Sequence, residues 1–90
     1  MKVLLAEDNP MIRKLLVSQL HGWKYEVTES VNGDQAWDEF QKQHFSLVLT
    51  DWMMPEVDGL ELIRRIRKSS SAGYVYIVLL TARTENEDLV

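Results

Sequence analysis

The sequence predicts a doubly wound α/β fold, in which a parallel sheet carries helices on both faces. Short apolar runs alternate with segments whose apolar residues recur at helical spacing. Several of the runs are continuously apolar, which is typical of strands buried on both sides. Capping and turn residues separate the segments. The order strand–helix, repeated three times and followed by a fourth strand, therefore predicts parallel strands joined by right-handed helical crossovers.

The first unit combines a buried strand with an amphipathic helix. Residues 3–6 form a continuous apolar run and are predicted to be the strand. Asn9 can cap a helix, and Pro10 suits its first position. We expect one helical stripe to face the sheet, made of Ile12, Leu15, Leu16 and Leu20. Gly22 is predicted to end this helix in a left-handed conformation.

The second and third units repeat this pattern. Residues 25–30 alternate and predict a strand, Asn32 and Gly33 mark a turn, and Asp34 can start a helix. Three residues of that helix are expected to face inward: Ala36, Trp37 and Phe40. Residues 47–49 predict the third strand, which ends at Thr50 and Asp51. A loop containing Pro55 and Gly59 precedes a helix whose apolar stripe comprises Leu62, Ile63 and Ile66.

The last segments predict a fourth strand and the start of a fourth helix. Residues 69–73 form a short connection, and residues 75–80 form a β-prone run. Thr84 and Glu87 have the spacing of a capping box. Because the sequence ends at Val90, only a stub of this helix is expected. We therefore expect one domain over residues 1–90, incomplete at its C-terminus.

Composition excludes several classes of function. A chain of 90 residues with 46% apolar and 27% charged residues suits one globular domain. The net charge of −4 argues against nucleic-acid binding, which needs clustered Lys and Arg. The absence of cysteine removes disulfides and thiolate catalysis, and it fits the cytoplasm. No apolar run is long enough for a membrane span, so we expect no membrane contact.

Carboxylates stand at two of the predicted strand ends. Glu7 and Asp8 follow the first strand, and Asp51 ends the third. If the strand order is 2-1-3-4, these strands are neighbours at the switch point where ligands of such sheets bind. Clustered carboxylates repel one another unless a cation lies between them, and Mg²⁺ prefers such oxygen ligands. A carboxylate can also attack phosphorus. Thr81, at the end of the fourth strand, can donate to a phosphoryl oxygen.

Each of these residues also has a purely structural interpretation. Asp51 can be a turn residue, Glu7 and Asp8 can stabilise the N-terminus of the following helix, and Thr81 can simply be a β-branched strand residue.

Three other functions stay open for the chain as a whole. An aspartyl phosphohydrolase resembles D-x-D, but Met53 stands two residues after Asp51. A non-catalytic flavodoxin-like module that binds flavin favours a Ser/Thr/Gly-rich phosphate loop after the first strand, where Glu7 and Asp8 would repel a phosphate in the absence of a metal. A module that has lost its chemical activity would act only by docking to other proteins.

At these residues the chain resembles the receiver domains of two-component (His-Asp) response regulators. The resemblance covers the whole chain and rests on three motifs: V-L-L-A-E-D-N-P at 3–10, L-V-L-T-D-W-M-M-P-E-V-D-G-L-E-L at 47–62, and I-V-L-L-T-A at 77–82. It implies a flavodoxin-like parallel sheet of order 2-1-3-4. It also implies a bacterial signalling protein that changes conformation to control an output, and that is not itself an enzyme.

The resemblance also implies the roles of the site residues. Asp51 is the phosphoacceptor, and Thr81 is the switch hydroxyl. Glu7, Asp8, Asp51 and the backbone carbonyl of Met53 hold Mg²⁺ or Mn²⁺. The implied partner is a sensor histidine kinase or a phosphotransfer protein.

The chain departs from the family pattern at its end. The resemblance implies a complete fourth helix, a fifth strand ending in a lysine, and a fifth helix, and none of these is present in the sequence. Lys68 does not replace that lysine. We therefore expect a truncated receiver, in which the edge of residues 75–80 favours self-association or element exchange. The alternative is a receiver that acts only as a docking module.

Overall fold

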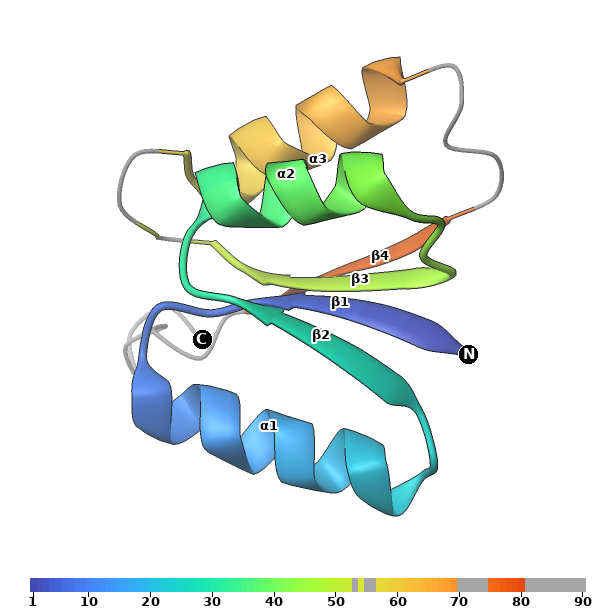
Figure 1. The fold of residues 1–90 in the computed structure, drawn as a ribbon. Coiled ribbons are helices and arrows are strands. Elements are labelled where there is room, and N and C mark those ends of the chain that lie inside the picture. Colours follow the sequence, from blue (N-terminus) through green and yellow to red (C-terminus); the bar gives the residue numbers. More distant parts are fainter. Residues whose placement is uncertain (53, 55–56, 70–74, 81–90) are drawn as a thin grey trace, which may run out of the picture.

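Four parallel strands form one sheet in the order β2-β1-β3-β4 (Figure 1). The computed structural model describes residues 1–52, 54, 57–69 and 75–80. Its elements are β1 (Lys2–Ala6), α1 (Pro10–Gly22), β2 (Glu26–Ser30), α2 (Gly33–Lys42), β3 (Leu47–Asp51), α3 (Gly59–Lys68) and β4 (Tyr76–Leu80). The predicted fold class and strand order are confirmed. The predictions for Met53, Pro55, Thr81 and the helix after Thr84 lie outside the described residues.

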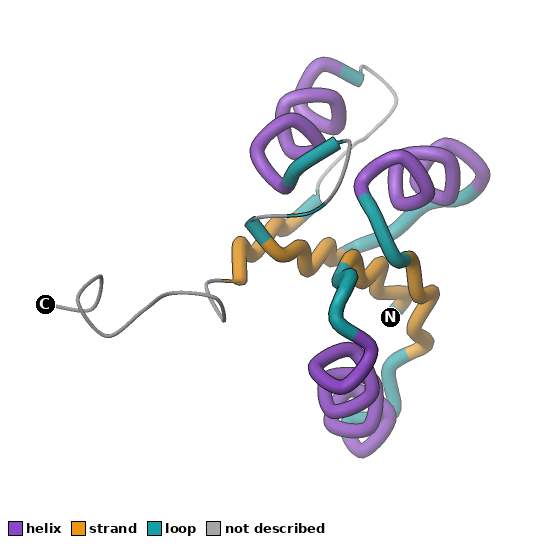
Figure 2. The backbone as a smooth tube through the Cα atoms, turned by 90° about the vertical axis from the view of Figure 1, so that its left-hand side faces the viewer, coloured by secondary structure: helices purple, strands orange, loops and turns teal. Residues whose placement is uncertain are grey.

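The helices form two layers around the sheet. Helix α1 covers one face, and α2 and α3 lie side by side on the other (Figures 1 and 2). The main core lies between α2, α3 and the sheet, and its buried members include Leu4, Val48, Leu62 and Ile66. The rings of Trp37, Phe40 and Phe45 stack in sequence, with centroids 6.0 and 6.4 Å apart. None of the helices in the described part is long and apolar enough to cross a membrane.

The register of the strands brings their carboxyl ends to one edge of the sheet. Ala6 of β1 pairs with Ser30 of β2 and with Thr50 of β3, and Asp51 pairs with Leu80 of β4. The residues that follow β1 therefore lie beside the residues that end β3. In parallel sheets of this kind, ligands bind at this edge, beyond the carboxyl ends of the strands.

The end of α1 differs from the prediction. Gly22 is the last helical residue, and the left-handed residue is Lys24, with φ 66°. The Tyr25 N–H donates to the Leu20 carbonyl and the Lys24 N–H to the His21 carbonyl, which is the Schellman arrangement. The helix runs one residue further because the Trp23 N–H still closes the last turn on Gln19 and Leu20. The prediction for Gly22 is therefore wrong.

Two further predictions need correction. Helix α2 begins at Gly33 with Asn32 as its cap, because the Asn32 side chain accepts the Gln35 N–H at 2.7 Å. Asp34 is thus a first-turn residue and not the start. Leu15 was expected to face the sheet but is 62% exposed. Helix α1 packs mainly over β2, and the Leu15 side chain points away from this contact and stays exposed.

Gly59 begins α3 where no side chain fits. A Cβ at this position would collide with the carbonyl oxygen of Asp51 and would meet the Leu79 side chain at 3.1 Å. The Gly59 N–H also donates to the Trp52 carbonyl at 2.8 Å. The glycine thus lets the N-terminus of α3 pack directly on the end of β3.

We predict opposite effects for alanine at two glycines. Gly59→Ala should lower the free energy of unfolding by about 1–3 kcal/mol, because the backbone must shift to admit the methyl group. Gly22→Ala should raise it by about 0.5–1 kcal/mol, because nothing lies within 4 Å of its Cβ position and alanine favours helix. Urea denaturation of both variants and the parent measures the difference. Equal changes in the free energy of unfolding would show that α3 does not need the close approach of Gly59 to the Asp51 carbonyl.

Candidate metal centre

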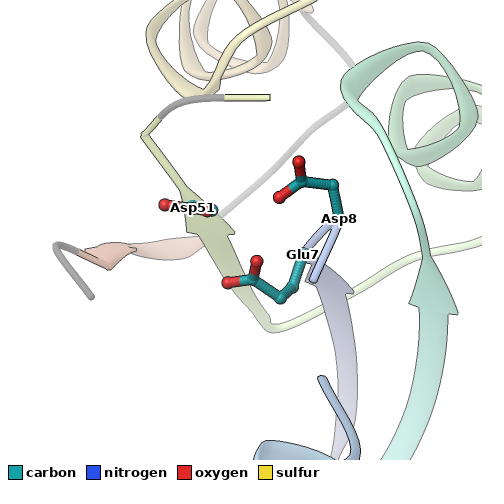
Figure 3. A group of neighbouring side chains, drawn as sticks. All are labelled: Glu7, Asp8 and Asp51. Carbon is teal, nitrogen blue, oxygen red and sulfur yellow. The ribbon is translucent and has the colours of Figure 1, made fainter. Parts of the chain in front are cut away.

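Three carboxylates meet at the carboxyl edge of the sheet (Figure 3). Glu7 and Asp8 follow β1, and Asp51 is the last residue of β3. One oxygen from each lies within 4.8 Å of the others. The structure thus brings together the three acidic residues that the sequence placed at strand ends. Met53 and Thr81 lie outside the described residues.

Burial makes this cluster electrostatically costly. The side chains of Glu7 and Asp51 are fully buried, and Asp8 is half-buried. Glu7 Oε2 accepts the Asn9 N–H at 3.0 Å, but among the described residues no N–H or O–H donates to the buried Glu7 Oε1. The described acidic neighbours of Glu7 are Asp8 and Asp51, and a hydrogen bond between two carboxylates needs a shared proton.

The environment therefore favours the protonated form of Glu7. The pKa of Glu7 is raised from 4.5 to about 7, mainly by burial and to a lesser extent by the charge of Asp51 and the hydrogen bonds with Asp51 and Asp8. The Asn9 N–H opposes this by lowering the pKa, because it stabilises the carboxylate. A divalent cation among these oxygens would replace the proton.

The donor set suits a hard cation. All three side chains offer oxygen, and Glu7 Oε1, which is buried and has no donor among the described residues, is available for coordination. Mg²⁺ binds such sites through one or two carboxylates and keeps several waters. No soft ligand lies in the cluster. The residues present therefore fit Mg²⁺ or Mn²⁺.

The backbone around the cluster is held from several sides. The Glu7 N–H donates to the Ser30 carbonyl at 3.1 Å, and Arg13 Nη1 donates to the Glu7 carbonyl at 2.9 Å. From the sequence, Asn9 was expected only to cap α1, and no role was predicted for Arg13. The capping role of Asn9 is real, since its side chain accepts the Met11 N–H at 2.9 Å. Its backbone contact with Glu7 could not be read from residue types.

We predict that Glu7→Gln changes how stability depends on pH. The raised pKa of Glu7 stabilises the metal-free fold below pH 4.5, and this contribution is lost as the pH rises through about 7. The rise corresponds to at most about 3 kcal/mol. As the pH rises from 5 to 8, the free energy of unfolding of Glu7→Gln should therefore increase by up to this amount relative to that of the parent. Urea denaturation in the presence of a chelator measures the difference. Glu26→Gln, on an exposed residue of β2, is the control. Parallel pH profiles of Glu7→Gln and the parent would contradict the account.

Comparison with known proteins gives the family of the chain. The family model of the response regulator receiver domain matches residues 3–90. The sensor protein EvgS of Escherichia coli O157:H7 is 42% identical over 88 residues, which cover 98% of this chain and 7% of that protein. The structure of the chemotaxis response regulator CheY4 of Vibrio cholerae matches with 31% identity and a TM-score of 0.86, over 96% of this chain and 72% of that chain.

A third match involves a complex. The co-crystal structure of the Saccharomyces cerevisiae histidine phosphotransfer signaling protein Ypd1 and the receiver domain of its downstream response regulator Ssk1 matches with 28% identity and a TM-score of 0.81. The match covers 98% of this chain and 68% of that chain. With the fold, the acidic cluster and the family model in agreement, the chain belongs to the response regulator receiver domain family.

Proposed function

We propose that the chain accepts a phosphoryl group on Asp51 with the help of a divalent cation. The observation that carries this proposal is the convergence of Asp51 with Glu7 and Asp8 at the carboxyl edge of the sheet, with one oxygen of each within 4.8 Å of the others. Membership of the receiver family supports the same role for Asp51. The donor is a phosphohistidine on a sensor kinase or phosphotransfer protein, and the Ypd1–Ssk1 complex is a precedent among the structural matches.

The chemistry assigned to Asp51 is a phosphoryl transfer between two side chains. One carboxylate oxygen of Asp51 attacks phosphorus, the bond from phosphorus to the histidine nitrogen breaks, and that nitrogen keeps the electron pair and takes a proton. The product is an acyl phosphate. Burial holds Asp51 among carboxylates and away from bulk water. When bound, Mg²⁺ supplies positive charge for the carboxylates and the phosphoryl oxygens.

The remaining residues have supporting roles in this proposal. Asp8 would hold the cation directly, Glu7 would contribute through its buried Oε1, and Asp51 and the Met53 carbonyl would complete the protein ligands. The Thr81 hydroxyl donates to the phosphoryl oxygen and links its arrival to a change in conformation that controls output. The chain serves as acceptor and switch in a bacterial cytoplasmic phosphorelay, and it is not an enzyme with turnover on a small substrate.

Exposed apolar residues on β4 favour a second candidate, a docking module. Tyr76 is 61% exposed and Val78 is 45% exposed, and the five residues of β4 carry no charge. In the part of the chain that the structure describes, β4 pairs only with β3. Such an edge suits self-association or pairing with another strand. Binding without phosphorylation distinguishes this candidate from the first.

We predict that Asp51→Asn abolishes phosphorylation. With acetyl phosphate and Mg²⁺, the parent should acquire one label that borohydride reduction traps at Asp51 in mass spectrometry, and Asp51→Asn should show only background. Asp58→Asn is a matched control, because Asp58 is exposed and caps α3, a role that asparagine also fills. Full labelling of Asp51→Asn would refute the assignment of the acceptor.

We predict that Asp8→Ala weakens Mg²⁺ binding at least about tenfold, because it removes a charged ligand from the only cation cluster found among the described residues. Calorimetric titration with Mg²⁺ measures this loss. Asp34→Ala removes an equal charge from an exposed position of α2 and should change the affinity less than twofold. If Asp8→Ala binds as tightly as the parent, the proposed ligand set is wrong.

A further inference from the structure

We propose that Arg13 is a positioning residue that holds the peptide unit between Glu7 and Asp8 in the geometry that binds the cation. This inference rests on the proposed function of the acidic cluster. Arg13 lies in the first turns of α1, and its side chain is 19% exposed. Its Nη1 donates to the Glu7 carbonyl at 2.9 Å, and its Nε lies 3.4 Å from Glu29 Oε1 on β2.

The guanidinium is suited to this bridge by its shape. The donors of Arg13 form a planar fork, so one side can bind the Glu7 carbonyl while another faces the Glu29 carboxylate. The backbone of Arg13 is itself fixed, because its N–H donates to the Asn9 carbonyl at 2.9 Å. Arg13 therefore ties three segments together: the first turns of α1, the loop after β1 and the edge strand β2.

The contact acts on Asp8 through the peptide plane. The Glu7 carbonyl belongs to the same rigid unit as the Asp8 N–H, because the peptide bond is planar. Rotation of this unit would move the Asp8 carboxylate relative to Asp51. On the other side, the Glu7 N–H is held by the Ser30 carbonyl and the Glu7 side chain by the Asn9 N–H. The carbonyl is the remaining polar group of the Glu7 backbone, and Arg13 holds it in place although the carboxylates repel one another.

Binding of Mn²⁺ tests this role directly. Electron paramagnetic resonance of free Mn²⁺ reports the dissociation constant without relying on phosphorylation. We expect Arg13→Gln to bind Mn²⁺ roughly tenfold more weakly, as is typical when a group that orients a metal ligand is removed. Lys14→Gln removes the same charge from the next, exposed position of α1 and should stay within twofold of the parent. Arg13→Lys keeps a charge and a donor and should recover part of the loss.

Three further measurements separate this role from other causes. Thermal melts confirm that each variant is folded at the titration temperature, because destabilisation alone leaves the affinity of folded molecules unchanged. Glu29→Gln should weaken binding less than threefold, since the contact with the Glu7 carbonyl remains. Asp8→Ala tests the cation site itself: if it binds as the parent does, the proposed function fails, whatever the result for Arg13.

If Asp8→Ala binds Mn²⁺ more weakly than the parent, the Arg13 variants and their controls decide whether the inference holds. Arg13→Gln within twofold of the parent, or no tighter binding by Arg13→Lys than by Arg13→Gln, would overturn it. Equal losses in Arg13→Gln and Lys14→Gln would also overturn it, because they would indicate a general charge effect. A loss in Glu29→Gln as large as that in Arg13→Gln would place the effect in the ion pair and not in the Glu7 contact.

Discussion

Repulsion among three carboxylates at one edge of the sheet is the constraint on which the rest of the site depends. Glu7 and Asp51 are fully buried and Asp8 is half-buried, so solvent screens their charges poorly. A proton on Glu7 relieves the repulsion in the metal-free molecule, since the pKa of Glu7 is raised to about 7. A divalent cation bound among these oxygens would relieve it more completely. The same repulsion that destabilises the cluster would therefore favour binding of the cation.

The fold keeps the carboxylates together despite this repulsion. The order β2-β1-β3-β4 makes β1 and β3 neighbours, and their register brings the residues after Ala6 beside Asp51. The close approach of Gly59 to the Asp51 carbonyl fixes the end of β3 against α3. The core under α2 and α3 lies on the sheet face opposite α1 and supplies apolar burial, which offsets the cost of the cluster. Function and stability thus use different parts of one sheet.

The sequence predicted the features that depend on local pattern. Apolar runs and capping residues gave the elements and their order, and strand-end acids predicted the cluster. Features that depend on tertiary packing were missed. Helical periodicity cannot tell how much of a stripe is covered, so the exposure of Leu15 was not predicted. Glycine preference pointed to Gly22, whereas the hydrogen bonds of the last turn place Lys24 in the left-handed conformation. The contact of Arg13 with the Glu7 carbonyl spans six residues and follows no motif.

If Mg²⁺ replaces the proton on Glu7, binding of Mg²⁺ must release that proton, and the number released can be counted during a Mg²⁺ titration. Calorimetry in buffers with different enthalpies of ionisation gives the number of protons released for each Mg²⁺ bound. Because the pKa of Glu7 is raised to about 7, we predict release of nearly one proton at pH 6 and almost none at pH 8.5. Binding of Mg²⁺ at pH 6 without proton release would contradict the claim that a protonated Glu7 balances the charge of the metal-free cluster.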